Sequence, residues 1–172
     1  KELLNRIVAM IMNFVTADSC LIYLYDRQND ELILTASSKP KEKSIGRVKL
    51  KIGEGVTGWA AKEKRPVVLP KEAYKDQRFK TFLSLEEDKY QAFMSIPILS
   101  KDEVIGVMNI RNMEAHTYPE HQVNLLFTVN RYLGSAIQNT IIYEDVIRKA
   151  KQLDLLSEVS RTIVSDHYLK EI

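Results

Sequence analysis

A glycine-rich segment is the first place in this chain where residue types and spacing suggest chemistry. Gly53 to Gly58 (G-E-G-V-T-G) match the pattern G-x-G-x-x-G, which in dinucleotide-binding proteins surrounds a pyrophosphate at a helix N-terminus. Such a site also needs a preceding strand that is buried on both faces and an acidic residue after the next strand. Here Lys49 and Lys51 make the preceding strand one-sided, and no acid ends the next strand at Leu69. We therefore expect the glycines to serve a tight turn and the close packing of a short helix.

The cysteine and histidine residues do not form a pattern typical of catalysis or metal binding. Cys20 is the single cysteine, which excludes an internal disulfide and favours a small buried apolar side chain. His116 and His121 lie on either side of a proline, and His167 lies near the C-terminal end. The sequence contains no H-x-x-x-H, C-x-x-C or G-x-S-x-G arrangement. We therefore expect no catalytic residue, no metal site, no required cofactor and no enzymatic activity.

Composition and charge exclude several classes of partner. The 172 residues, 45% of them hydrophobic, are enough for one domain with a core and a modest extension. Lys and Arg number 25 against 23 Asp and Glu, a net charge of +2, which gives no reason to expect nucleic acid or an anionic membrane as partner. No apolar run approaches the roughly 20 residues that span a bilayer. We expect a cytoplasmic fragment of a longer polypeptide, since the chain starts at lysine and shows no secretory signal.

Hydrophobic periodicity predicts a helix followed by a region of short strands. The expected elements are a helix at residues 3–14, strands at 20–25, 31–37 and 48–52, a short helix at 56–64, and strands at 67–69, 92–99 and 103–112. Polar turns at 26–30 and 100–102 fit hairpins between the strands that they join. The segment at 74–85 is irregular, partly helical and rich in aromatic residues.

After Pro119 the hydrophobic pattern becomes helical. Residues 120–164 contain no proline and a single glycine, Gly134. The distal half of this helix has an imperfect heptad seam, interrupted by Lys149 and Ser160 and formed by Ile142, Val146, Leu153, Leu156 and Ile163. Such a seam needs a partner helix. Ser165 and Asp166 then predict the N-cap of a new helix. We predict a domain at 1–143, a signalling helix with coiled-coil character at 144–164, and the start of a truncated downstream element at 165–172.

The order of these elements and several local motifs resemble the GAF domain, a sensory module of signalling proteins. The motifs are A-D-S-C-L-I-Y-L-Y-D at 17–26, the glycine segment at 52–70, A-Y-K-D-Q-R-F at 73–79, the strand pair at 95–112, and the exit helix at 118–139. The resemblance covers about residues 3–143. It implies an α+β fold with an antiparallel sheet of five to six strands and the N- and C-terminal helices on one face. The other face would hold a pocket roofed by the loop at 74–85, and a long C-terminal helix would follow.

The resemblance also implies candidates for a small-molecule site on the roofed face. These are Tyr23, Trp59, Tyr74, Arg78, Phe79, Phe82, Phe93 and Ser95. Apolar walls with a few placed polar groups suit a small organic ligand, and Arg78 can pair with an anionic ligand or with Asp76. The alternative is that the aromatic rings fill the space themselves. Binding of cyclic nucleotides is not favoured, because Met113 replaces the lysine that phosphodiesterase-type members carry after Asn112.

The resemblance implies a non-catalytic sensory domain that binds a small molecule and relays the signal through a dimeric helical bundle. The homodimer would form through the terminal helices, and the output would be an effector domain in the same polypeptide: a kinase, cyclase, phosphodiesterase or transcription activator, as in two-component systems. One enzymatic GAF subfamily reduces free methionine sulfoxide with paired cysteines, which a single cysteine does not match. The principal alternative is a ligand-free dimerisation spacer, and a cyclic-nucleotide-binding domain comes third. The ligand is not identified by the sequence.

Overall fold

The computed structural model describes residues 2–39, 43–82, 85 and 89–169, with side chains described as far as residue 163. The chain divides into two compact units, Lys1–Ser135 and Ala136–Ile172. The first unit contains the sheet and the helices that cover it, and the second continues the last helix. Most described side chains that follow Ser135 are exposed. The predicted domain at 1–143 and signalling helix at 144–164 stay predictions.

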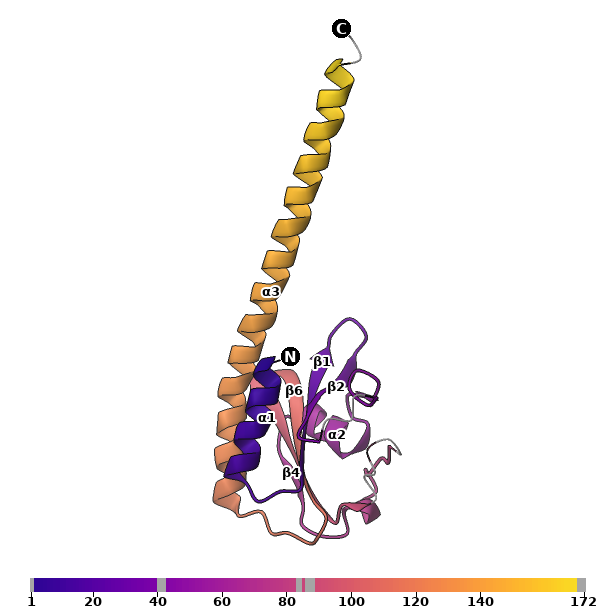
Figure 1. Cartoon of the computed structure of the whole chain (residues 1–172). Coiled ribbons are helices and arrows are strands. Elements are labelled where there is room, and N and C mark those ends of the chain that lie inside the picture. The colour runs from indigo at the N-terminus through magenta and orange to yellow at the C-terminus, as the bar shows by residue number, and fades with distance from the viewer. Residues whose placement is uncertain (1, 40–42, 83–84, 86–88, 170–172) are drawn as a thin grey trace. The chain divides into compact units, whose positions relative to one another are not determined.

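Six antiparallel strands form one sheet in the order β3-β2-β1-β6-β5-β4 (Figure 1). The strands are β1 (Ser19–Asp26), β2 (Glu31–Ser37), β3 (Lys49–Lys51), β4 (Val67–Leu69), β5 (Ala92–Ser100) and β6 (Glu103–Asn112). β1 with β2 and β5 with β6 form the two predicted hairpins, and β6 pairs with β1 to join the two halves of the sheet. The predicted α+β fold with an antiparallel sheet of five to six strands is therefore confirmed.

Helix α1 (Glu2–Phe14) and the first part of α3 (Glu120–Leu169) lie on one side of the sheet (Figure 1). α1 buries the apolar stripe expected from its periodicity, formed by Leu4, Ile7, Val8 and Ile11. Burial of such a side chain stabilises the fold by about 1.5–3 kcal/mol relative to exposure. On α3, the Asn130 amide donates from Nδ2 to the carbonyl oxygen of Ile96, at 3.3 Å. Both terminal helices are thus attached to the sheet.

The glycine-rich segment forms a tight turn and then α2 (Gly55–Glu63), which lies on the other side of the sheet (Figure 1). Gly53 has a φ of +87°, in the left-handed region that glycine favours, and its N–H donates to the Gly58 carbonyl at 2.7 Å. A Cβ on Gly58 would lie closer to the Lys51 carbonyl than the 3.0 Å that real Cβ atoms keep. The glycines thus serve a turn and a close helix contact, as the sequence indicates.

α3 stays helical to Leu169, which corrects the prediction that a new helix begins at Ser165 and Asp166. Serine and aspartate inside a helix cost at most about 0.7 kcal/mol relative to alanine, whereas proline costs about 3 kcal/mol. No proline or glycine follows Gly134 in the sequence, so the helix continues. Residues 170–172 lie outside the described residues, and a downstream element at 165–172 stays a prediction. Among the described helices, none has the length and the apolar character that crossing a membrane requires.

Candidate functional site

The side of the sheet next to α2 carries polar side chains at its centre, and we call it the α2 face. The strand register places on this face the side chains of Ser19, Leu21, Tyr23, Phe93, Ser95, Val107, Asn109 and Arg111. Asn109 donates from Nδ2 to Thr57 Oγ1 on α2 at 2.8 Å, and Ser95 Oγ donates to Asn109 Oδ1 at 2.6 Å. All three side chains are buried. Because buried polar groups are stable only when they are hydrogen-bonded, this network sets the position of α2 on the sheet.

The aromatic pocket candidates divide into two groups. Phe79 and Phe93 make an edge-to-face contact with ring centroids 6.1 Å apart, and Trp59 packs in the same cluster. Tyr23 is completely buried in a second cluster, against which Phe82 packs. The structure therefore brings three of the predicted aromatic residues together and places two others in a neighbouring part of the core.

Arg78 forms an ion pair within the chain. Its Nε and Nη2 donate to the two carboxylate oxygens of Asp76 at 2.9 and 2.8 Å, and its guanidinium lies 4.6 Å from the Trp59 ring centroid. Hydrogen bonds from Arg78 hold the pKa of Asp76 below its ordinary value. Of the two partners expected for Arg78, the structure thus shows Asp76. Tyr74, on the short helix η1 (Ala73–Lys75), is 43% exposed and belongs to neither cluster.

The cavity among the aromatic candidates is small. It has a volume of about 10 Å³ and is lined by Phe79, Phe82, Phe93 and Thr57, among others. A single water needs about 10–15 Å³ measured in this way. As the described side chains pack here, the rings fill most of the space between them.

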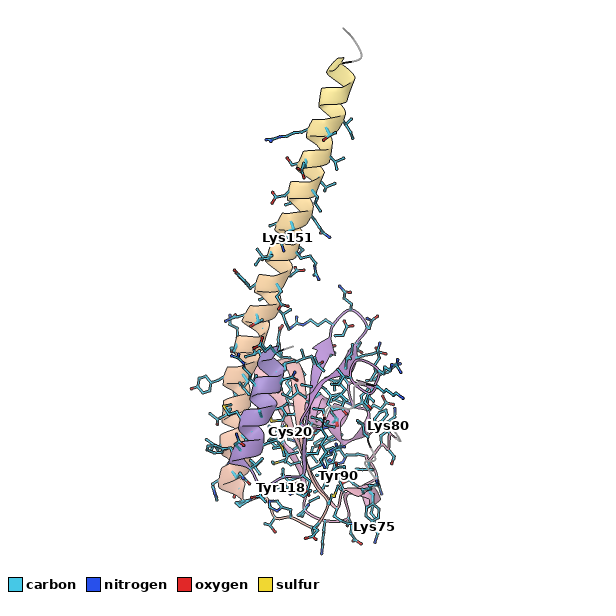
Figure 2. All side chains as sticks on the ribbon, viewed as in Figure 1. Cys20, Lys75, Lys80, Tyr90, Tyr118 and Lys151 are labelled. Carbon is cyan, nitrogen blue, oxygen red and sulfur yellow. The ribbon has the colours of Figure 1, made fainter. Side chains whose placement is uncertain are left out.

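A larger, partly open cavity lies around Arg111, whose cross-strand neighbour on β5 is Phe93. Its volume is about 80 Å³, and its lining includes Arg111, Tyr90, Lys39, Lys89 and Ser44. Arg111 is 3% exposed. Its guanidinium lies 4.1 Å from the Tyr90 ring centroid, and its Nη2 donates to Ser19 Oγ at 2.8 Å. Figure 2 shows Tyr90 among the packed side chains of the domain, whereas Lys75 and Lys80 lie at its edge.

None of the residues lining this second cavity was among the pocket candidates expected from the sequence. The signal that could have found it is the alternation of β6, which places Arg111 on the same side as Asn109 and Val107. A charged residue on the buried side of a strand is rare unless it is paired or functional. Sequence alone does not show that Lys39 and Tyr90 lie near it, because they come from separate connections.

Cys20 is completely buried, and we predict that its thiol is unreactive in the folded protein. Burial raises the pKa of the Cys20 thiol from 9.0 to about 12, although the charge of Arg111 opposes this shift. A thiol reagent at about pH 8 should therefore label the native chain far more slowly than the chain in concentrated denaturant. The stability that neutral Cys20 contributes should be present below pH 9.0 and lost as the pH rises toward about 12. Equal labelling rates for the native and the denatured chain would contradict this placement of the thiol.

Asn112, which aligns with the asparagine of the cyclic-nucleotide motif, has structural partners. It donates from Nδ2 to the carbonyl oxygen of Thr16 at 2.9 Å and accepts a hydrogen bond from the Tyr118 hydroxyl at 2.7 Å. His116 packs edge-on against Tyr118, with ring centroids 4.9 Å apart. No three His, Cys, Asp or Glu side chains of the described residues group as metal ligands. Through Asn112, Tyr118 hydrogen-bonds the segment before α3 to the end of β6, and β6 in turn is hydrogen-bonded to the connection between α1 and β1.

Comparison with known proteins gives a family and several relatives. The family model of the GAF domain matches residues 1–138. The phosphoenolpyruvate-dependent phosphotransferase system protein of Escherichia coli is 26% identical over 139 residues, 81% of this chain and 18% of that protein. The cGMP-specific 3',5'-cyclic phosphodiesterase of Drosophila melanogaster is 28% identical over 127 residues, 72% of this chain and 11% of that protein. The chain thus spans less than a fifth of the length of these curated relatives.

Solved structures support the same family and also include enzymes. The GAF domain from a phosphoenolpyruvate-protein phosphotransferase of Coxiella burnetii aligns with a TM-score of 0.75 at 26% identity, over 81% of this chain and 83% of that one. The free methionine-R-sulfoxide reductase from Neisseria meningitidis aligns with a TM-score of 0.62 at 19% identity, over 74% of this chain and 71% of that one. The second likeness concerns the fold alone. The fold is therefore found both in phosphotransferase domains and in enzymes.

Proposed function

Because this chain belongs to the GAF domain family, we propose that it is a regulatory domain that binds a small molecule on its α2 face and signals through α3. In this proposal the domain does not catalyse a reaction. It forms a homodimer through its terminal helices and controls an effector domain in the same polypeptide. The relatives named as a phosphotransferase system protein and a phosphodiesterase support an effector of one of these kinds.

The observation that carries this proposal is the continuity of α3, which is one helix of 50 residues. Its first part packs directly on β5. A Cβ on Gly134 would lie closer to the Leu99 carbonyl than real Cβ atoms come, and Ser135 Oγ lies 3.4 Å from Ser100 Oγ. In this proposal, a shift at the first turns of α3 reaches its second part through the backbone hydrogen bonds that continue along an α-helix.

We expect a signal from the α2 face to reach α3 through one pair of strands, β6 and β5. Asn109 and Arg111 lie on β6, which is hydrogen-bonded to β5 along nine residue pairs. β5 carries the carbonyl of Ile96, which accepts from Asn130 on α3. A ligand that binds one arrangement of the α2 face more tightly than another can therefore bias the position of α3, and this differential affinity is what couples ligand to output.

The second part of α3 exposes an apolar seam that suits a second copy of the chain. The predicted seam residues are between 55% and 66% exposed: Ile142, Val146, Leu153, Leu156 and Ile163. A helix with such a row of apolar side chains is stabilised mainly by packing against a partner. Lys149, which interrupts the seam, is paired with Asp145 on its own helix at 2.9 Å. An identical helix offers the same seam in the same register, so we propose a homodimer.

Two single substitutions of matched exposure test the dimer. Leu156 lies on the seam and is 63% exposed, whereas its neighbour Leu155 lies off the seam and is 61% exposed. We expect Leu156→Glu to weaken dimerisation by about 100-fold or more, because it removes a packed leucine and places two charges opposite each other. Leu155→Glu should leave the dimer intact. Sedimentation equilibrium of both variants, the parent chain and a chain ending at Tyr143 measures this; a parent chain with monomeric mass would refute the dimer.

A ligand-free dimerisation spacer is the second candidate function, favoured by the dense packing of Trp59, Phe79 and Phe93. Thermal unfolding in the presence of 2-oxoacids, cyclic nucleotides, nucleobases and haem separates the two. A ligand at 100 times its Kd adds about 2.7 kcal/mol to the free energy of unfolding, which is readily detected. If the chain dimerises and none of these compounds shifts the transition, the spacer is the better description.

A further inference from the structure

We propose that the cavity at Arg111 receives an oxyanion group, a carboxylate or a phosphate, of the molecule that this domain binds. The inference rests on the proposed function, since it names the chemistry of a ligand on the α2 face. Arg111 projects from β6 into the core of the domain, is 3% exposed, and lines a cavity of about 80 Å³. A buried guanidinium in its wall is the feature that distinguishes this cavity from the aromatic one.

The guanidinium is held in a defined orientation. Its plane is covered by the Tyr90 ring at 4.1 Å, and Ser19 Oγ accepts from Nη2 at 2.8 Å. A planar guanidinium binds a carboxylate or a phosphate through two parallel N–H donors, and fixing it beforehand reduces the entropy lost on binding. Arg111 and Lys89 also interact with other groups of the chain, which a bound anion would join or displace.

The charge of the described lining favours an anion. The ionisable side chains among the named lining residues are Lys39, Lys89 and Arg111, together with the Tyr90 phenol. Ser37 and Ser44 add hydroxyl groups to the same wall. Arg78, the arginine that the sequence suggested for an anion, pairs with Asp76 and is partly exposed, whereas Arg111 is 3% exposed. Because attraction between opposite charges is stronger away from water, the buried Arg111 is the better candidate for recognising an anionic group.

The size of the cavity limits what it holds. A cavity of roughly 150 Å³ accommodates benzene, and sites for drug-sized ligands measure about 300–1,000 Å³. At about 80 Å³, this cavity suits inorganic phosphate or the acid group of a small metabolite. Ser37, Lys39 and Ile45 line both this cavity and a groove of about 630 Å³ beside α1, which is also lined by Val8 and Met12. An anion in the cavity thus contacts a wall that is shared with the N-terminal helix.

Isothermal titration calorimetry with three probes tests this inference. The probes are inorganic phosphate, succinate, and the neutral succinamide, each titrated into the whole chain at low ionic strength. We expect phosphate or succinate to bind, and whichever binds identifies the source of the anionic group. Succinamide should not bind, because it lacks the charge that Arg111 recognises. If neither anion binds at millimolar concentration, or if succinamide binds as well as succinate, the inference is wrong.

Four variants locate the binding. Arg111→Gln should weaken it at least roughly tenfold, since hydrogen bonds to charged groups contribute about that much or more. Lys39→Gln changes an exposed side chain of the wall, leaves the core intact and should weaken binding about two- to fivefold. Lys151→Gln, a charge-matched control on the exposed part of α3 (Figure 2), should change nothing. Leu156→Glu should bind the anion as well as the parent chain does, so failure of the dimer and failure of the anion site give different results.

Circular dichroism shows first whether Arg111→Gln folds. If Arg111→Gln does not fold, the anion affinities of Lys39→Gln and Lys151→Gln are compared instead. Both substitutions are at exposed positions, so both variants should fold. Equal anion affinity in these two variants would place the binding elsewhere and overturn the assignment to this cavity. Unchanged affinity in a folded Arg111→Gln variant would do the same.

Discussion

Replacing Gly134 by alanine should lower the free energy of unfolding by about 2 kcal/mol, even though alanine is the better helix former. In a free helix, alanine is favoured over glycine by about 1 kcal/mol. Here the new Cβ would lie closer to the Leu99 carbonyl than the 3.0 Å that real Cβ atoms keep. Leu99 belongs to β5, which is paired with β6 along nine residue pairs, so α3 has to move away from the sheet. Overpacking of this kind typically costs about 1–3 kcal/mol and occasionally more.

The control for Gly134→Ala is Asn124→Ala on the exposed side of the same part of α3. Both changes raise helix propensity, but only one adds an atom at a contact with the sheet. Thermal unfolding followed by circular dichroism should show Gly134→Ala melting roughly 4–8 °C below the parent chain, with Asn124→Ala at or slightly above it. A melting temperature for Gly134→Ala equal to or above that of the parent would show that α3 does not pack on β5 as described.

Replacing Asn109 by leucine should destabilise the domain by about 3 kcal/mol. The substitution removes the group that accepts from Ser95 Oγ and donates to Thr57 Oγ1, and both hydroxyl groups stay buried. Each buried polar group left without a partner costs about 1–3 kcal/mol. α2 also loses its polar link to the sheet, so the loss should appear in denaturant unfolding as a lower midpoint.

A triple variant separates unsatisfied polarity from lost packing. Thr57→Val, Ser95→Ala and Asn109→Leu together leave no orphaned hydroxyl in the network. Replacing all partners by apolar groups of similar shape can be nearly neutral, so the triple variant should recover most of the stability that Asn109→Leu loses. If the triple variant is less stable than Asn109→Leu alone, the hydrogen bonds of this network do not explain the effect.

Local patterns were sufficient for the elements of the fold. The three- and four-residue steps of α1 and the two polar turns led to the correct helix and hairpins, because backbone periodicity and turn chemistry act over a few residues. The φ of Gly53 and the contact at Gly58 likewise agree with the turn expected from their spacing. The helix start expected at Ser165 was wrong, because a capping residue without a helix breaker does not stop an established helix.

The contacts within the candidate site could be predicted from the sequence only in part. Trp59, Phe79 and Phe93 belong to one cluster, and the cavity that Phe79, Phe82 and Phe93 line measures only about 10 Å³. Their role in binding a ligand stays a prediction. Ser95 was expected to be a polar group of the pocket, and the structure shows that its hydroxyl donates to Asn109, which in turn donates to Thr57. The long-range partner could not be inferred, because it depends on the strand register and on where α2 lies.

By itself, the sequence determined the order and type of the elements, the family, and the apolar seam of the last helix. These features depend on residues that are near one another in the chain, and their patterns are therefore visible in one dimension. Only the tertiary structure decided which arginine is buried beside a cavity, why the single glycine of α3 is needed, and which buried polar groups are paired. Each of those features is a contact between side chains or backbones brought together by strand pairing and helix packing, and sequence separation carries no information about such distances.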